Sequence, residues 1–180
     1  MRASLVSPAT VLGPLMASAL LAATVAPALG ATASFPDPVD TPEGADVTAV
    51  KVKHENRVKV VLEHTGLEDQ AAVEMTYWLD TKPRNPGPEY RVWFAANSDG
   101  FDVRRVDTWR DRGRSVDCAR YGAKADVFSD DPIVMWVHRS CLGGPRKVRV
   151  GVKVREIQEG TTTVDWAPAK RTFTGWVRRG

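Results

Sequence analysis

Two neighbouring segments place tryptophans beside hydrogen-bonding and charged side chains at the spacing of a β-strand. The residues concerned are Thr76, Trp78 and Asp80 in the first segment and Arg91 and Trp93 in the second. Alternate positions of a strand point to the same face of a sheet. Between the two segments, residues 82–88 contain three prolines and a glycine, which end a strand and favour a loop. We therefore expect two adjacent strands that gather the five side chains on one face.

A face of this composition suits a sugar ring or a protein partner. Tryptophan offers rigid contact area, and arginine offers directional hydrogen-bond donors. The alternative interpretation is structural, with a loop or a terminal strand covering the face and Arg91 stacked on an indole. The sequence leaves both open. The predicted ligand-binding residues are Trp78, Asp80, Arg91, Trp93 and Trp109.

Three other tryptophans have simpler interpretations. Trp109 and Trp166 fall in predicted loops, beside Arg110 and Asp165. Loop tryptophans on a sandwich either contact a ligand or close the end of the core, and we favour the second role. Trp136 lies in an apolar run and is predicted to be a core residue.

Known catalytic motifs are incomplete in this chain. His54-Glu55 begins like a zinc-protease motif, but Val58 stands where the second histidine is needed. His138 and Ser140 lack both a nucleophile elbow and an acid that would orient the histidine. The sequence therefore predicts no catalytic residue and no cofactor, and an enzyme would need a site assembled from separate loops.

One group of oxygen ligands deserves comparison with calcium loops. Asn97, Asp99 and Asp102 surround Gly100 and could offer oxygens to a cation. Their spacing matches no EF-hand loop, and hairpin turns are rich in the same residue types. We therefore predict no metal site.

Residues 1–33 have the composition of an export signal peptide. Arg2 gives a positive start, residues 11–25 carry no charge, and the small residues of 28–30 and 31–33 offer two alternative cleavage sites. The apolar run is short for a membrane span and is interrupted by proline. We expect a secreted, extracellular protein with no membrane span in its mature chain.

Two cysteines follow this leader. Cys118 and Cys141 allow only one intramolecular pairing. In an oxidising compartment such a pair favours a disulfide, whereas a metal site would need more ligands than two isolated thiols. A Cys118–Cys141 disulfide is predicted.

The mature chain has the composition of a β protein. After the leader it contains 21 valines and only four leucines, and β-branched side chains favour strands. We expect residues 34–45, rich in proline, to form a flexible lead-in, and residues 46–180 to form a single domain. Short alternating segments separated by turns predict a two-sheet antiparallel sandwich, either jelly-roll-like or immunoglobulin-like.

Some parts of this pattern are clearer than others. The clearest alternation is at residues 148–154, and Asp99-Gly100 predicts a tight hairpin. Residues 133–137 form a nearly continuous apolar run, which predicts a strand covered on both faces. Residues 158–169 are predicted to be a polar loop before a last strand at 173–177.

Charge gives little reason to expect nucleic acid as a partner. The chain has 25 basic and 22 acidic residues, and the two kinds are interleaved. A nucleic-acid-binding domain would concentrate its basic residues on one face or stripe. No nucleic acid is predicted as a partner.

Short motifs carry a resemblance to known sandwich domains. Leu79-Asp80-Thr81, followed by residues 87–92 with their Glu-Tyr-Arg, resembles the family 9 carbohydrate-binding module and the DOMON-like group, as does the strand-then-turn segment at 134–143. The chain from 46 to 177 also resembles small secreted β-sandwich proteins of GC-rich bacteria. The module family clamps a sugar between two tryptophans, but its binding tryptophans do not align with specific positions here. The resemblance therefore implies the sandwich fold.

We expect a secreted, non-enzymatic protein that binds carbohydrate or cell-wall glycan through its aromatic face. The alternative is a secreted protein-interaction module, such as an inhibitor or an accessory protein of the envelope. An enzyme without a linear signature is the third hypothesis.

Overall fold

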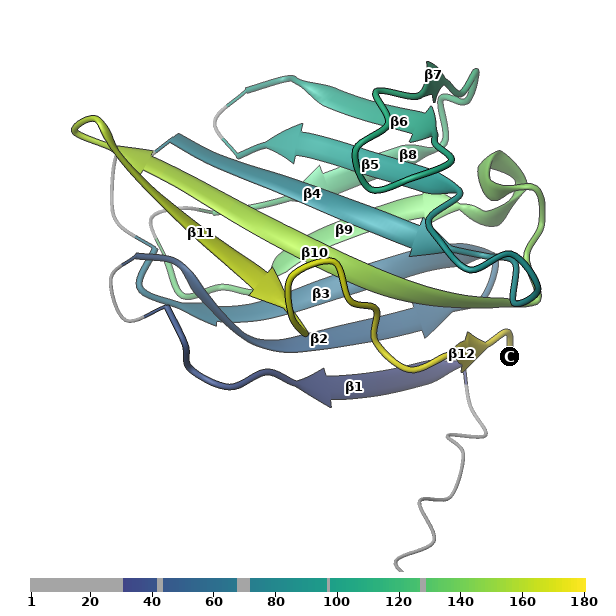
Figure 1. The fold of residues 1–180 in the computed structure, drawn as a ribbon, viewed down its shortest axis with the longest axis horizontal. Coiled ribbons are helices and arrows are strands. Elements are labelled where there is room, and N and C mark those ends of the chain that lie inside the picture. Colours follow the sequence, from purple (N-terminus) through teal and green to yellow (C-terminus); the bar gives the residue numbers. More distant parts are fainter. Residues whose placement is uncertain (1–30, 42–43, 68–71, 97, 127–128) are drawn as a thin grey trace, which may run out of the picture.

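The chain forms two antiparallel sheets, and each sheet contains strands from both halves of the sequence (Figure 1). The computed structural model describes residues 31–41, 44–67, 72–96, 98–126 and 129–180. Most of the predicted signal peptide, residues 1–30, lies outside the described residues. Within the described chain the first sheet has five strands and the second has seven. The predicted two-sheet antiparallel sandwich is confirmed.

The first sheet has the order β1-β2-β3-β9-β8. Its strands are β1 (Thr32–Pro36), β2 (Asp46–His54), β3 (Arg57–Thr65), β9 (Ile133–His138) and β8 (Tyr121–Lys124). The second sheet has the order β11-β10-β4-β5-β6-β7, and β12 pairs with β10 beside this path. Its strands are β11 (Thr161–Ala167), β10 (Lys147–Gln158), β4 (Ala72–Asp80), β5 (Tyr90–Ala95), β6 (Phe101–Arg105), β7 (Arg114–Ser115) and β12 (Val177–Arg178).

The core lies between the sheets and consists largely of the alternating valines. Val52 and Val60 of the first sheet are fully buried, as are Tyr77 and Val152 of the second. Their neighbours in sequence point away from the core, as the two-residue period of a strand requires. Burial of one valine or leucine side chain stabilises the fold by about 1.5 to 3 kcal/mol relative to leaving it exposed. The outer faces are thus left for polar and aromatic residues.

The predicted disulfide is present. Cys118 follows β7, and Cys141 lies in the 3₁₀ helix η1 (Arg139–Leu142) after β9. Their Cα atoms are 5.7 Å apart. The bond therefore links the edge of the second sheet to the end of a strand in the first.

Two segments that the sequence predicts to be irregular form strands instead. Residues 32–36 form β1 and pair with β2, so residues 34–36 are not part of a flexible lead-in. Pro36 is tolerated because β1 is an edge strand and ends there. Residues 161–167, predicted as loop, form β11 against β10. Their turn is Glu159-Gly160, where both residues have positive φ, of 47° and 82°, as in a type I′ hairpin.

Other boundaries differ in smaller ways. Strand β9 is covered on one face only, because Val134 and Trp136 point outward and are half-buried. Gly100 does not adopt the left-handed φ of a two-residue turn, and β6 begins directly after it. The last strand, β12, contains only Val177–Arg178. The part of the chain that the structure describes contains no helix with the length and hydropathy to cross a bilayer.

Candidate functional site

The outer face of the second sheet carries the predicted aromatic cluster. Strands β4 and β5 pair so that Trp78 faces Arg91 and Thr76 faces Trp93. The same row continues to Asp102 on β6 and to Lys153 on β10. The predicted pairing of the two segments is therefore present, and it brings the side chains from four adjacent strands together.

An open cavity of about 310 Å³ lies over this row. Its lining consists of Thr76, Trp78, Arg91, Trp93, Asp102 and Lys153. Trp93 and Lys153 are half-buried, whereas Thr76 and Trp78 are buried. The cavity thus combines one accessible indole with hydroxyl, guanidinium, ammonium and carboxylate groups.

Trp78 is covered by other aromatic rings on the outer face of the second sheet. It is 5 % exposed, because the rings of Trp166 and Trp109 both lie 5.2 Å from its own, centroid to centroid. Trp109 in turn contacts Phe173 at 4.5 Å. For Trp78 the structural interpretation is therefore correct: the rings of Trp109 and Trp166 cover it. Trp93 remains beside the open cavity.

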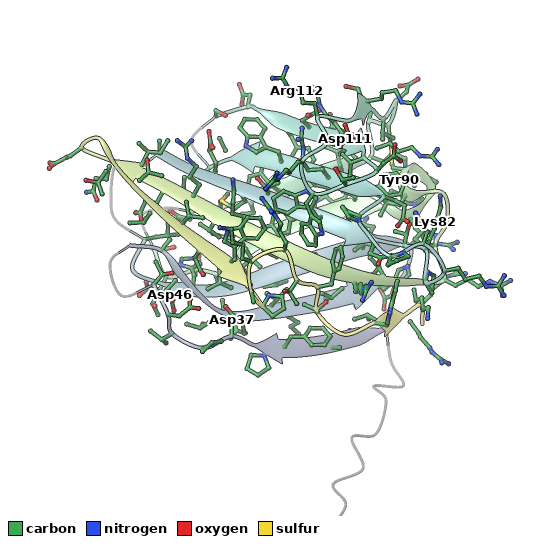
Figure 2. All side chains as sticks on the ribbon, viewed as in Figure 1. Asp37, Asp46, Lys82, Tyr90, Asp111 and Arg112 are labelled. Atoms are coloured by element: carbon green, nitrogen blue, oxygen red, sulfur yellow. A yellow bond between two sulfur atoms is a disulfide. The ribbon has the colours of Figure 1, made fainter. Side chains whose placement is uncertain are left out.

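Arg91 holds one covering segment in place. Its two terminal nitrogens donate to the carbonyl oxygens of Asp111 and Arg112, each at 3.3 Å. Figure 2 shows these two residues in the loop that lies over the second sheet. The guanidinium is thus fixed by backbone carbonyls, and no indole ring in the described chain stacks on it.

The loop between β6 and β7 is itself closed by local hydrogen bonds. The carboxylate of Asp111 accepts from the backbone N–H groups of Gly113, at 2.9 Å, and Asp107, at 3.0 Å. These bonds lower the pKa of Asp111, with the Gly113 bond the largest cause. Gly113 has φ of 68°, and a Cβ there would lie 2.5 Å from the carbonyl oxygen of Arg105. Asp111 and Gly113 therefore fix the conformation of this loop.

Asp80, predicted as a ligand-binding residue, does not line the cavity. It is fully buried, and its Oδ2 accepts from Arg149 Nη2 at 2.6 Å and Nε at 2.8 Å. The same guanidinium lies over the rings of Phe173 and Trp176, each at 4.7 Å. Asp80 therefore fastens the segment after β11, which crosses β10 in Figure 1.

Lys153 is the cavity group that the sequence analysis missed. It forms no ion pair with any carboxylate in the described residues. Burial lowers its pKa, and the positive charges of Arg155 and Arg91 lower it further, against an opposing effect of Glu74. The single acid of the cavity, Asp102, is already paired with Arg104 at 2.5 Å. The cavity consequently has an excess of positive charge.

The other residues singled out from the sequence lie elsewhere. Trp136 is on the outer face of the first sheet, half-buried under Arg57 at 4.4 Å, and is not a core residue. His138 bonds to Ser140 across the start of η1, with 2.7 Å between Nδ1 and Oγ. Asp99 is exposed, and Asn97 lies outside the described residues. Trp136, His138 and Asp99 do not line the cavity.

Sandwich folds serve many unrelated functions, so the fold alone does not identify an activity. The predicted resemblance to carbohydrate-binding modules rests on short sequence motifs. Comparisons of the chain with protein-family models, with curated proteins and with solved structures found no match.

Proposed function

We propose that the protein is a secreted, non-enzymatic glycan-binding protein that holds its ligand in the cavity between Trp93 and Lys153. The observation that carries the proposal is the cavity itself, where one accessible indole stands beside polar groups from four strands. Its volume of about 310 Å³ is at the lower end of small-molecule sites, which suits one or two sugar rings. An indole packs against the apolar face of a sugar, while donors bind its hydroxyl groups.

The charge of the cavity favours a sugar that carries a carboxylate or phosphate. Lys153 forms no ion pair with a carboxylate among the described residues, and burial disfavours its charged form. An anionic group of the ligand would supply the missing partner and form a charge-assisted hydrogen bond. Acidic cell-wall glycans carry such groups on sugar rings.

The aromatic and hydrogen-bond contacts around the cavity support a binding role because they keep its walls rigid. Trp78 lies below Trp109 and Trp166, and Arg91 fixes the neighbouring loop. A site whose walls are already ordered loses less entropy when the ligand binds. Trp78 and Trp109 are then positioning residues, and Trp93 provides the contact surface.

Calorimetric titration with oligogalacturonate, and with a neutral cello-oligosaccharide for comparison, tests the proposal. We expect binding of the acidic probe, and at least about tenfold weaker binding in Lys153→Gln, because a charge-assisted bond is worth about 1.5 to 3 kcal/mol. Trp93→Ala should abolish binding of both probes. Trp136→Ala, which removes a half-buried tryptophan from the other sheet, is the matched control.

Two results would contradict glycan binding. One is the absence of heat with both probes and with polysaccharides of other compositions. The other is an equal loss in the Trp93→Ala and Trp136→Ala variants, which would locate the effect in stability. A protein partner retained by Trp93→Ala would favour the interaction-module alternative. Among the described residues only Val39 and Val164 are large exposed apolar side chains, so these residues form no apolar patch on which a partner could dock.

Export is part of the same proposal. The Cys118–Cys141 disulfide is the kind of bond that persists in oxidising compartments. It supports the interpretation of residues 1–33 as a signal peptide. Recovery of the mature chain from the culture medium of the producing cell tests it, and retention of the full-length chain inside the cell would contradict it.

A further inference from the structure

Four aspartates gather where the connection after β1 meets the second sheet. Asp37 and Asp40 belong to this connection, Asp46 begins β2, and Asp165 is on β11. Carboxylate oxygens of Asp40, Asp46 and Asp165 all lie within 4.8 Å of one another. Figure 2 shows Asp37 and Asp46 near each other at this end of the sandwich. The carboxylates therefore converge from both sheets.

Most of this cluster is buried without a compensating positive charge. Asp37 is 8 % exposed, and Asp46 and Asp165 are each 2 % exposed. In the described part of the chain, no lysine, arginine or histidine nitrogen lies within ion-pair distance of the four carboxylates. Burial of unpaired carboxylates is costly, and a native protein usually compensates it with a partner or a metal.

Several buried oxygens in the cluster also lack hydrogen bonds. Neither carboxylate oxygen of Asp37 has a partner among the described residues, and the same is true of Oδ2 of Asp46. Three buried carboxylate oxygens of the cluster are thus left without a hydrogen-bond donor among the described residues.

Backbone groups hold the other oxygens of the cluster in position. Asp46 Oδ1 accepts from the N–H groups of Asp40, at 3.0 Å, and Thr41, at 2.7 Å. Asp165 Oδ2 accepts from the N–H of Val47 at 2.7 Å. Such outer hydrogen bonds orient carboxylates that ligate metals. The carboxylates of Asp46 and Asp165 are therefore held in position by backbone donors.

We infer that Asp37, Asp40, Asp46 and Asp165 form a calcium site that joins the connection after β1 to strand β11. Calcium takes six to eight oxygen ligands at about 2.3 to 2.6 Å, so its ligand oxygens can be up to about 5 Å apart across the ion. The spacing of the three closest carboxylates is compatible with this geometry. The cluster offers only oxygens, which disfavours zinc, and magnesium rarely takes so many carboxylates.

The ion would have a structural role. Asp46 and Asp165 come from different sheets, and Asp40 lies on the exposed connection between β1 and β2. One calcium ion would offset two of the negative charges and fasten the edge strand β11 to the start of β2. This end of the sandwich is opposite to η1, where the disulfide lies (Figure 1).

Calorimetry with calcium chloride on protein first treated with EDTA tests the site. We expect one calcium per chain, with weaker binding of magnesium. At a calcium concentration about 100 times the dissociation constant, the Tm should rise by about 5 to 10 °C. Asp40→Asn, at an exposed position, should weaken calcium binding at least about tenfold while the chain still folds.

Two further variants locate the effect. Asp165→Asn keeps an oxygen for the Val47 N–H but removes charge, and it should also weaken binding. Asp117→Asn changes the same charge at an exposed residue next to Cys118, which is bonded to η1 at the opposite end of the sandwich, and it should bind calcium like the wild type. The site is overturned if calcium up to about 10 mM, above the range of weak extracellular sites, gives neither heat nor a Tm shift. Unchanged binding in both Asp40→Asn and Asp165→Asn would equally exclude these ligands.

Discussion

The rings of Trp78 and Trp166 are stacked, with 5.2 Å between centroids and an interplanar angle of 14°. Trp78 is on β4, Trp166 is on the edge strand β11, and β10 lies between the two strands. The contact therefore bridges three strands on the outer face of the second sheet. It makes Trp78 part of a second, smaller core, whose outer border is the cavity beside Trp93.

The two tryptophans of the predicted face should differ in their contribution to stability. Trp78→Ala leaves a cavity beneath Trp109 and Trp166 and should lower the free energy of unfolding by about 3 to 5 kcal/mol. Trp93→Ala removes a half-buried ring and should cost less than about 2 kcal/mol. Urea denaturation of both variants measures the difference. Equal losses would contradict the second core.

Asp80 should matter for stability and not for ligand affinity. Asp80→Asn weakens the buried pair with Arg149 and should lower the free energy of unfolding by about 1 to 3 kcal/mol. The affinity of the cavity for its glycan should stay within about twofold of the wild type, because Asp80 does not line it. Denaturation and titration of the same variant check both statements. A large loss of affinity in a well-folded variant would show that Asp80 takes part in ligand binding.

His54 should lower the free energy of unfolding as the solution is acidified below pH 6.5. This side chain is fully buried and donates from Nδ1 to the carbonyl oxygen of Val177. Burial lowers its pKa below the ordinary value of 6.5, and the charges of Arg139 and Arg179 add to the effect. Below pH 6.5 the unfolded chain therefore binds a proton that folded His54 resists, and stability is lost as pH falls from 6.5 toward the folded pKa.

Thermal or urea unfolding between pH 8 and pH 5 measures this effect. The contribution of one histidine to the slope is at most about 1.4 kcal/mol per pH unit. His54→Asn should reduce the slope below pH 6.5, whatever its effect on absolute stability. Between pH 7 and 8, where both states of the wild type carry neutral His54, the two proteins should give parallel curves. An unchanged slope at low pH would assign the acid sensitivity to other groups.

The N-terminus of the mature protein should be Ala31. Cleavage after Gly30 leaves all of β1, whereas cleavage after Ala33 removes the residues that pair with Lys53 and Val52. The carbonyl oxygen of Ala31 also accepts from the N–H of His54 at 2.5 Å. Mass spectrometry of the intact secreted chain distinguishes the two sites. A mature chain that begins at Ser34 would contradict this prediction.

Local patterns were sufficient to predict the strands whose apolar residues alternate cleanly. The valines of β2, β3 and β10 belong to this class, and so does the pairing of Trp78 with Arg91. Strand β11 was missed because its threonines and acids carry little apolar signal. Strand β1 was missed because Pro36 is near two other prolines, although an edge strand tolerates proline at its end.

The composition of the site depended on contacts that no local pattern contains. Lys153 reaches the cavity because β10 pairs with β4, and Trp166 covers Trp78 because β11 pairs with β10. The aspartate cluster has the same origin, since Asp165 is far from Asp37 in the sequence. A possible signal was present in the three aspartates at 37, 40 and 46, which are dense for a segment expected to be unstructured.

The order of strands also sets the course of folding. Val60 pairs with Met135, and Tyr77 pairs with Val152, so both central ladders join residues about 75 positions apart. Neither sheet can close until the C-terminal third of the chain is available. Sandwiches with such distant pairings fold in milliseconds to seconds, far more slowly than helical bundles. The N-terminal strands of a newly made chain therefore remain without their central partners until synthesis has passed residue 152.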